Sequence, residues 1–151
     1  MGAQLHVHDP VLSLLRWAGE GAGPPVYGHK LKNLHVLMMQ GIVDTYILPS
    51  IANATSLSMG LDLAGPSLGA GHPGLTEFVP LVDQLFLSGG AQLTLSVLGN
   101  RGEWTRVVVQ HAEDSVEHGH EFVFQVSAAG SQYGLFLEIL SQGAHRVQWG
   151  E

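Results

Sequence analysis

The chain has 151 residues, of which 6 are basic and 13 acidic, and this length predicts one domain that covers residues 1–151. The absence of cysteine excludes disulfides, thiol nucleophiles, iron–sulfur clusters and thiolate zinc sites. The formal charge of −7 argues against direct binding to nucleic acid, because neutralising phosphates requires clustered lysine and arginine.

Charged residues are sparse along the whole chain. They make up 13% of the sequence, about half of the usual quarter, whereas 45% of the residues are hydrophobic. A surface rich in serine, threonine, glutamine and glycine is one explanation. The other, which we favour, is that much of the surface lies against other subunits, because the cores of interfaces are depleted of charge.

The first half of the chain predicts short, irregular elements. Leu5 and Val7 alternate with polar residues and predict a short strand, and Asp9-Pro10 then has the chemistry of a helix start. That helix ends by Gly19, and a loop rich in glycine and proline follows. Strands are expected over residues 31–40, 42–48 and 78–87, with an apolar, Gly- and Pro-rich loop over residues 56–74 that packs on its own domain or on a neighbouring subunit.

The second half predicts strands separated by turns. Residues 91–98 alternate between apolar and polar, the turn residues 99–102 follow, and residues 104–110 carry three consecutive valines, so a β-hairpin is expected. Further strands are expected over residues 121–127 and 133–140 and around Val147 and Trp149. Taken with the first half, the pattern predicts an all-β fold: a single jelly roll of about eight antiparallel strands with one short helix.

Two histidine pairs are the clearest candidates for metal ligands. His6 and His8 form one pair, and His118 and His120 form the other; side chains at positions i and i+2 of a strand point the same way. The second pair resembles the HxH motif of the cupins, small β-barrels that bind a metal with it. Cupins place a glutamate several residues further on, whereas Glu121 is adjacent and would point to the opposite face. We therefore expect histidines that face solvent or an interface rather than a metal site.

The sequence holds no recognisable reaction centre. It lacks the G-x-S-x-G turn of a serine hydrolase and the G-K-[ST] end of a phosphate-binding loop. A run of acids and histidines is most simply a polar loop between two strands, with calcium binding or acid–base chemistry as the alternative; it comprises His111, Glu113, Asp114, Glu117, His118, His120 and Glu121. The sequence thus predicts a protein that is not an enzyme, with no catalytic, cofactor-binding or metal-binding residue and no cofactor.

In size, expected strand pattern and composition, the whole chain resembles the small single-jelly-roll major coat proteins of tailless, membrane-containing bacteriophages from hot environments. The resemblance implies a structural capsid protein of the virion, which builds an icosahedral shell through its interfaces. It also implies self-association, a second coat protein as partner and an underlying membrane. Exposed strand edges offer a further route to self-association, in which the strand around Leu5 and Val7 is exchanged between subunits. A decoration protein on a phage head fits the same features.

Two other functions stay open at this point. One is a cupin-like, metal-dependent enzyme that uses the His118/His120 pair, and the other is a carbohydrate-binding β-sandwich, for which the tryptophans and tyrosines could stack on sugars. Fold alone does not decide among them. Whether the histidine pairs bind metal or sense pH also stays open.

Overall fold

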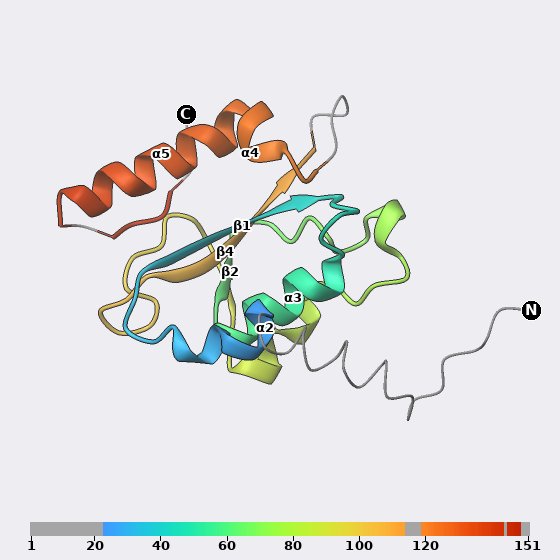
Figure 1. The fold of residues 1–151 in the computed structure, drawn as a ribbon, viewed down its shortest axis with the longest axis horizontal. Helices are drawn as coiled ribbons and strands as arrows, with labels where there is room; N and C mark the ends of the chain where they lie inside the picture. Colours follow the sequence, from blue (N-terminus) through green and yellow to red (C-terminus); the bar gives the residue numbers. More distant parts are fainter. Residues whose placement is uncertain (1–22, 114–118, 144, 149–151) are drawn as a thin grey trace, which may run out of the picture.

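The computed structural model describes residues 23–113, 119–143 and 145–148, and it shows a parallel sheet between layers of helices (Figure 1). The sheet has four strands in the order β1-β4-β2-β3. Their bounds are Val36–Ile42 (β1), Asp62–Ala64 (β2), Gln92–Leu93 (β3) and Arg106–Ala112 (β4). All three strand pairs are parallel.

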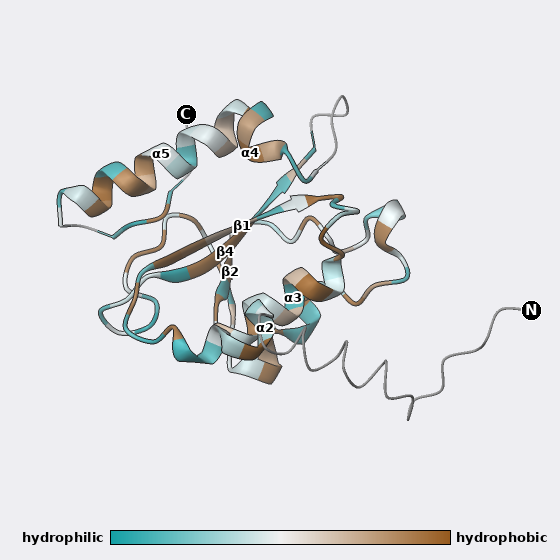
Figure 2. Ribbon diagram, viewed as in Figure 1, coloured by the Kyte–Doolittle hydropathy of each residue, from teal (hydrophilic) through white to brown (hydrophobic). Residues whose placement is uncertain are grey.

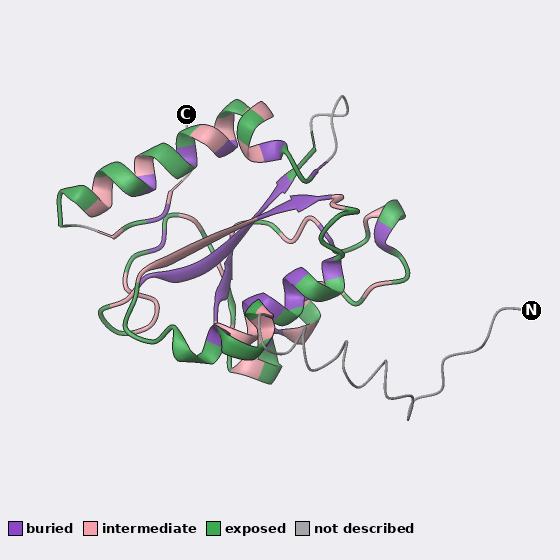
Figure 3. Cartoon of the chain, viewed as in Figure 1, coloured by how far each residue is buried: buried purple, intermediate pink, exposed green. Residues whose placement is uncertain are grey.

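Strand β4 is the centre of the core. It pairs with β1 along its whole length, from Val36 opposite Arg106 to Ile42 opposite Ala112, and with β2 on its other edge. Val107, Val108 and Val109 are fully buried. A strand that is buried on both faces carries a continuous run of branched apolar residues, as parallel sheets require. Figure 3 shows this burial along β4 and β2.

Helices cover both faces of the sheet. On one face, Phe136 of α5 (Ser127–Ser141) packs with Val107 and Val109. On the other, Val108 packs with Leu81 and Leu85 of the 3₁₀ helix η3 (Leu81–Ser88), next to α3 (Pro49–Ser58). Figure 2 shows that the strands between these two helix layers are largely hydrophobic. The shorter elements are α2 (Pro24–Tyr27), η1 (Gly28–Lys30), η2 (Pro73–Leu75) and α4 (Phe122–Gln125).

Local sequence explains where these helices begin and end. Pro49 starts α3 at a position where the missing N–H of proline costs no hydrogen bond. Gly89 ends η3 in the left-handed conformation, with φ of 65°, and its N–H bonds back to the carbonyl of Phe86. No helix in the described part of the chain is long and apolar enough to cross a membrane.

The expected jelly roll is wrong: the sheet is all-parallel, and several helices replace the single short helix. Residues 133–140, expected as a strand, belong to α5, and residues 121–127 hold α4 and the start of α5. The buried residues of α5 are Ala129, Gln132 and Phe136, a helical spacing. A short apolar run satisfies either a strand or a buried helix face, and here packing against β4 selected the helix.

The expected hairpin over residues 91–110 is also wrong. Its first strand is reduced to β3, which pairs with β2, and its second strand, β4, runs parallel to its neighbours. η3 lies where an edge strand was expected over residues 78–87. The loop expected over residues 56–74 includes the end of α3, all of β2 and the start of η2. Leu61 and Leu63 of that segment are fully buried in the chain's own core. The strand and helix expected before residue 20 lie outside the described residues.

We expect Leu63→Ala to destabilise the fold strongly. Leu63 is fully buried in the short strand β2, so its truncation should lower the free energy of unfolding by about 2–5 kcal/mol, measured by urea denaturation. Leu87→Ala removes the same atoms from a side chain that is 66% exposed, so it should change the free energy of unfolding by less than about 0.5 kcal/mol. If the two substitutions changed the free energy of unfolding equally, the burial of Leu63 in this core would be contradicted.

Candidate functional site

An acid and a histidine meet beyond the carboxyl ends of the two paired strands β1 and β4. Asp44 follows β1 by two residues, and His120 lies on the chain as it returns from β4. His120 Nδ1 is 3.0 Å from Asp44 Oδ2. The carboxylate side chain is 13% exposed and the imidazole 42% exposed, so the acid lies inside and the histidine faces outward. This is the arrangement in which an acid orients a reactive imidazole.

The Asp44 carboxylate is held in place by its own turn. The backbone N–H groups of Tyr46 and Ile47 donate to Oδ1 at 2.8 and 2.9 Å, which leaves Oδ2 to face His120. Burial by itself would raise the pKa of Asp44, but the hydrogen bonds from Ile47, from His120 and from Tyr46 lower that pKa below its ordinary value. Asp44 therefore stays ionised at neutral pH.

Two glycines allow the strand ends to approach closely enough for the pair to form. The Gly119 N–H donates to the carbonyl of Val43 at 3.1 Å. A Cβ at Gly119 would lie 2.3 Å from that carbonyl oxygen, and a Cβ at Gly41 would lie 1.8 Å from the Gly119 oxygen. Backbone atoms occupy both positions, so neither position has room for a side chain. The backbone next to His120 is thus fixed against the residue next to Asp44.

This geometry determines which imidazole nitrogen is basic. When Nδ1 donates its proton to Asp44, the lone pair of the neutral ring lies on Nε2. We assign this tautomer because the ionised Asp44 carboxylate can accept a hydrogen bond but cannot donate one. The Tyr46 ring lies at 5.1 Å from the imidazole, centroid to centroid, and adds a second contact that orients it. The pair can therefore accept a proton at Nε2 and stabilise the resulting imidazolium.

An apolar pocket opens beside the pair. It has a volume of about 270 Å³, and Asp44 and His120 both contribute to its wall. The remaining lining is mainly apolar and comes from β1, α4 and the turn after β1: Met38, Met39, Ile47, Phe122, Val123 and Phe124. Ligand sites typically combine such an apolar wall with a few converging polar groups.

Of the histidines and acids expected in one polar loop, those that the structure describes do not all lie in a loop. His111 belongs to β4, is 4% exposed, and bonds through Nε2 to Gln132 Oε1 at 2.9 Å. Burial lowers the pKa of His111, although that hydrogen bond opposes the shift. Glu121 accepts a hydrogen bond from Gln125. His6, His8, Asp114, Glu117 and His118 lie outside the described residues, and within the described ranges no three His, Asp, Glu or Cys side chains are arranged to hold a metal.

Sequence reasoning missed Asp44 altogether. It treated His120 as one half of an HxH pair, whereas the structure pairs it with an acid 76 residues away. Two local signals precede the pair: Gly41-x-x-Asp44 at the end of one apolar strand, and Gly119-His120 after another. Neither signal is informative until the two strands are known to be neighbours.

Comparisons of the chain with protein-family models, with curated proteins and with solved structures find no match.

We expect Asp44→Asn to remove part of the acid sensitivity of the fold. Because the pKa of Asp44 is lowered in the folded state, its contribution to stability is complete above the unfolded pKa, near 3.9, and is lost as pH falls through the folded value. Urea denaturation between pH 2 and 7 should therefore show a smaller loss of stability in the variant. Asp83→Asn, at an exposed carboxylate, is the control, and an identical effect of both substitutions would contradict the role of the pair.

Gly119→Ala and Gly134→Ala should have opposite effects. At Gly119 the added methyl meets the Val43 backbone, so the unfolding free energy should fall by about 1–3 kcal/mol. At Gly134, exposed within α5, a Cβ meets nothing within 4 Å, so the helix should gain about 0.5–1 kcal/mol. Thermal unfolding measures both, and a stable Gly119→Ala protein would show that the close approach is not required.

Proposed function

We propose that the Asp44–His120 pair is the general-base half of a hydrolytic site that acts on an ester with an apolar acyl group. The observation that carries the proposal is the contact between His120 Nδ1 and Asp44 Oδ2 at 3.0 Å, with the acid inside and the imidazole outside. In catalytic triads the buried aspartate fixes the tautomer of the histidine in this way, and the imidazole then takes the proton of the attacking hydroxyl.

The placement of the pair in the fold favours the same interpretation. Open parallel sheets bind ligands beyond the carboxyl ends of their strands, and Asp44 and His120 follow the carboxyl ends of adjacent strands. The order of acid before histidine along the chain is that of the α/β-hydrolases, in which the nucleophilic serine precedes both. Ser13 is the one serine that precedes Asp44 in this sequence, and it lies outside the described residues.

The proposed step needs one O–H group, from a serine side chain or from water. Its oxygen attacks the ester carbonyl carbon while its proton moves to His120 Nε2. Ionised Asp44 stabilises the imidazolium that forms and does not itself take the proton. When the tetrahedral intermediate collapses, the bond to the leaving alkoxide breaks, and Nε2 returns the proton to that oxygen. The pair is thus regenerated in its starting state. When the attacking oxygen is that of a serine, the acyl group remains on it as an ester, and a water molecule then attacks this ester with the same two proton transfers and releases the acid and the free serine.

The pocket beside the pair favours an apolar acyl group. Its lining of thioether, aliphatic and aromatic side chains can bury an acyl chain away from water. Burial of each methylene contributes about 0.8 kcal/mol. Asp44 and His120 are the ionisable side chains among the described residues that line it. A negatively charged acyl group would therefore find no lysine or arginine in the described wall.

The coat-protein function stays a prediction that no observation here tests, together with its second coat protein, its underlying membrane and its place in a virion. The jelly roll on which it rested is absent. One feature still favours self-association, namely large apolar side chains on the surface, such as Phe124, which is 90% exposed, and Phe86 and Tyr46, each 74% exposed. Native mass spectrometry over a dilution series measures the subunit number.

Ester hydrolysis tests the proposed function. The purified chain should hydrolyse p-nitrophenyl butyrate, and His120→Ala and Asp44→Asn should each lower kcat/KM by roughly a hundredfold or more. His145→Gln, whose ring stacks on His35 next to the opposite end of the sheet, should leave it unchanged. A fluorophosphonate probe then identifies the nucleophile: labelling that is lost in Ser13→Ala indicates the serine, and activity without labelling indicates water.

A second measurement tests the pair independently of turnover. In a ¹⁵N–¹H correlation spectrum of the imidazoles, His120 should carry its proton on Nδ1, with the proton resonance shifted far downfield by Asp44, and Asp44→Asn should abolish that shift. If the Nδ1 signal is present but the wild type has no more esterase activity than the two variants, the proposed reaction is refuted while the pair itself stands. A neutral ring with its proton on Nε2 rather than on Nδ1 in the wild type would refute the pair itself.

A further inference from the structure

A second pocket, about 360 Å³ in volume, lies at the amino-terminal end of the sheet. Its ionisable lining residues, within the described part of the chain, are all basic: His29, Lys32, Arg101 and Arg106. The chain carries only 6 lysines and arginines and has a formal charge of −7, so three of those cations around one pocket are a marked concentration of positive charge.

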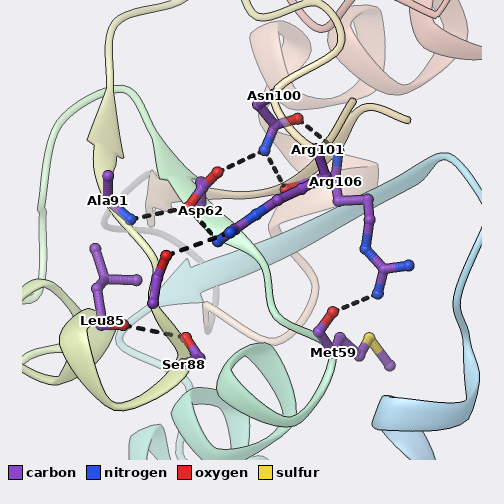
Figure 4. A network of polar contacts seen from close by, with 9 residues as sticks. Met59, Asp62, Leu85, Ser88, Ala91, Asn100, Arg101 and Arg106 are labelled. Atoms are coloured by element: carbon purple, nitrogen blue, oxygen red, sulfur yellow. Dashed lines mark hydrogen bonds and ion pairs between the residues drawn. The ribbon is translucent and has the colours of Figure 1, made fainter. Parts of the chain in front are cut away.

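Arg106 supplies the buried positive charge of this pocket. It is the first residue of β4 and is 7% exposed. Its Nη1 donates to the carbonyl of Leu31 and its Nη2 to the carbonyl of Met59, the latter drawn in Figure 4. Both acceptors are uncharged, and no described carboxylate lies within ion-pair distance of this guanidinium. The charge is therefore fixed in position and lacks a counter-ion among the described residues.

Arg101 forms an ion pair with Asp62. Its Nη2 lies 2.7 Å from Asp62 Oδ1, and the Asp62 carboxylate also accepts from the Ala91 N–H and from Asn100 Nδ2 (Figure 4). Arg101 Nε is buried and has no hydrogen-bond partner within the described ranges. Burial, and after it the repulsion from Arg101, lower the pKa of Arg106. A buried donor without a partner is costly unless a ligand or water fills the position.

We propose that this pocket binds a phosphate group, either as inorganic phosphate or as part of a phosphomonoester. Arg101 is paired with Asp62, whereas the wall itself carries two guanidinium groups and an ammonium group and no acid among the described residues, so a dianion would complete the charge balance. Guanidinium groups suit phosphate oxygens because they present several N–H donors in one plane. Ser58 and Ser88 contribute hydroxyl groups to the same wall. The volume is ample for a phosphate and a part of the molecule that carries it.

The proposed phosphate pocket is separate from the Asp44–His120 pair. Arg106 begins β4, whereas the pair lies beyond the end of that strand, and seven residues of extended chain span roughly 20 Å. The phosphate group would thus not contact the proposed general base. The proposal depends on the cationic pocket alone and stands whether or not the pair hydrolyses esters.

Calorimetric titration with sodium phosphate at pH 7.5 and low ionic strength tests the proposal. Saturable binding is expected, and Lys32→Gln should raise the Kd by roughly tenfold, the effect of one lost charge-assisted hydrogen bond. Lys30→Gln is the matched control: it removes the same charge two residues away, from a side chain that lies over the Tyr27 ring outside the pocket. That variant should change the Kd by less than twofold.

The choice of lysine variants keeps the test independent of folding, because Lys32 is exposed whereas Arg106 supports the core. Phenyl phosphate distinguishes the source: tighter binding than inorganic phosphate indicates a phosphomonoester ligand, and equal binding indicates the ion. If Lys32→Gln and Lys30→Gln weaken phosphate binding equally, the binding reflects the overall charge of the protein and the proposal is overturned. Heats no larger than those from sodium chloride of the same ionic strength would also overturn it.

Discussion

The parallel pairing of β1 with β4 is the constraint on which the rest of the structure depends. It joins segments that are 70 residues apart, as Gln40 and Gln110 show. Because the register runs in step from Val36 to Ile42, the two strands end together, and the chain beyond each end meets the other. Gly41 and Gly119 then let the backbones touch. The Asp44–His120 pair therefore depends on this pairing as well as on the local features of each segment.

Buried polar side chains hold the surrounding loops on β4. Gln110 donates through Nε2 to Gln40 and accepts from the backbone N–H groups of Leu68 and Gly69, so the loop after β2 is tied to the strand. His111, which points to the other face, bonds to Gln132 of α5. Each of these groups has its partner, which is why the strand tolerates polar residues within its buried length.

The two ends of the sheet therefore differ in chemistry. The carboxyl end places a fixed carboxylate and an imidazole beside an apolar wall, which suits proton transfer on an uncharged substrate. The amino end collects guanidinium groups around Asp62, with more cations than acids among the described residues. In a chain with so few charges, this separation supports the different ligands that we propose for the two ends. Asp62 and Arg101 also connect β2, β3 and the turn before β4, so the basic end is part of the framework.

The sequence by itself determined where apolar segments must be buried and where the chain must turn. The valines of residues 107–109 predicted a strand and form one, and the glycines of residues 99–102 predicted a turn, in which Gly99 and Gly102 take positive φ. It did not determine whether the run at residues 133–140 is strand or helix, because a short apolar run fits either, or whether β4 pairs with the segment before it or with β1. Only the tertiary structure decided those points. Strand partners and helix faces are selected by the burial of segments far apart in the chain, and Asp44 and His120 become a site only after that selection is made.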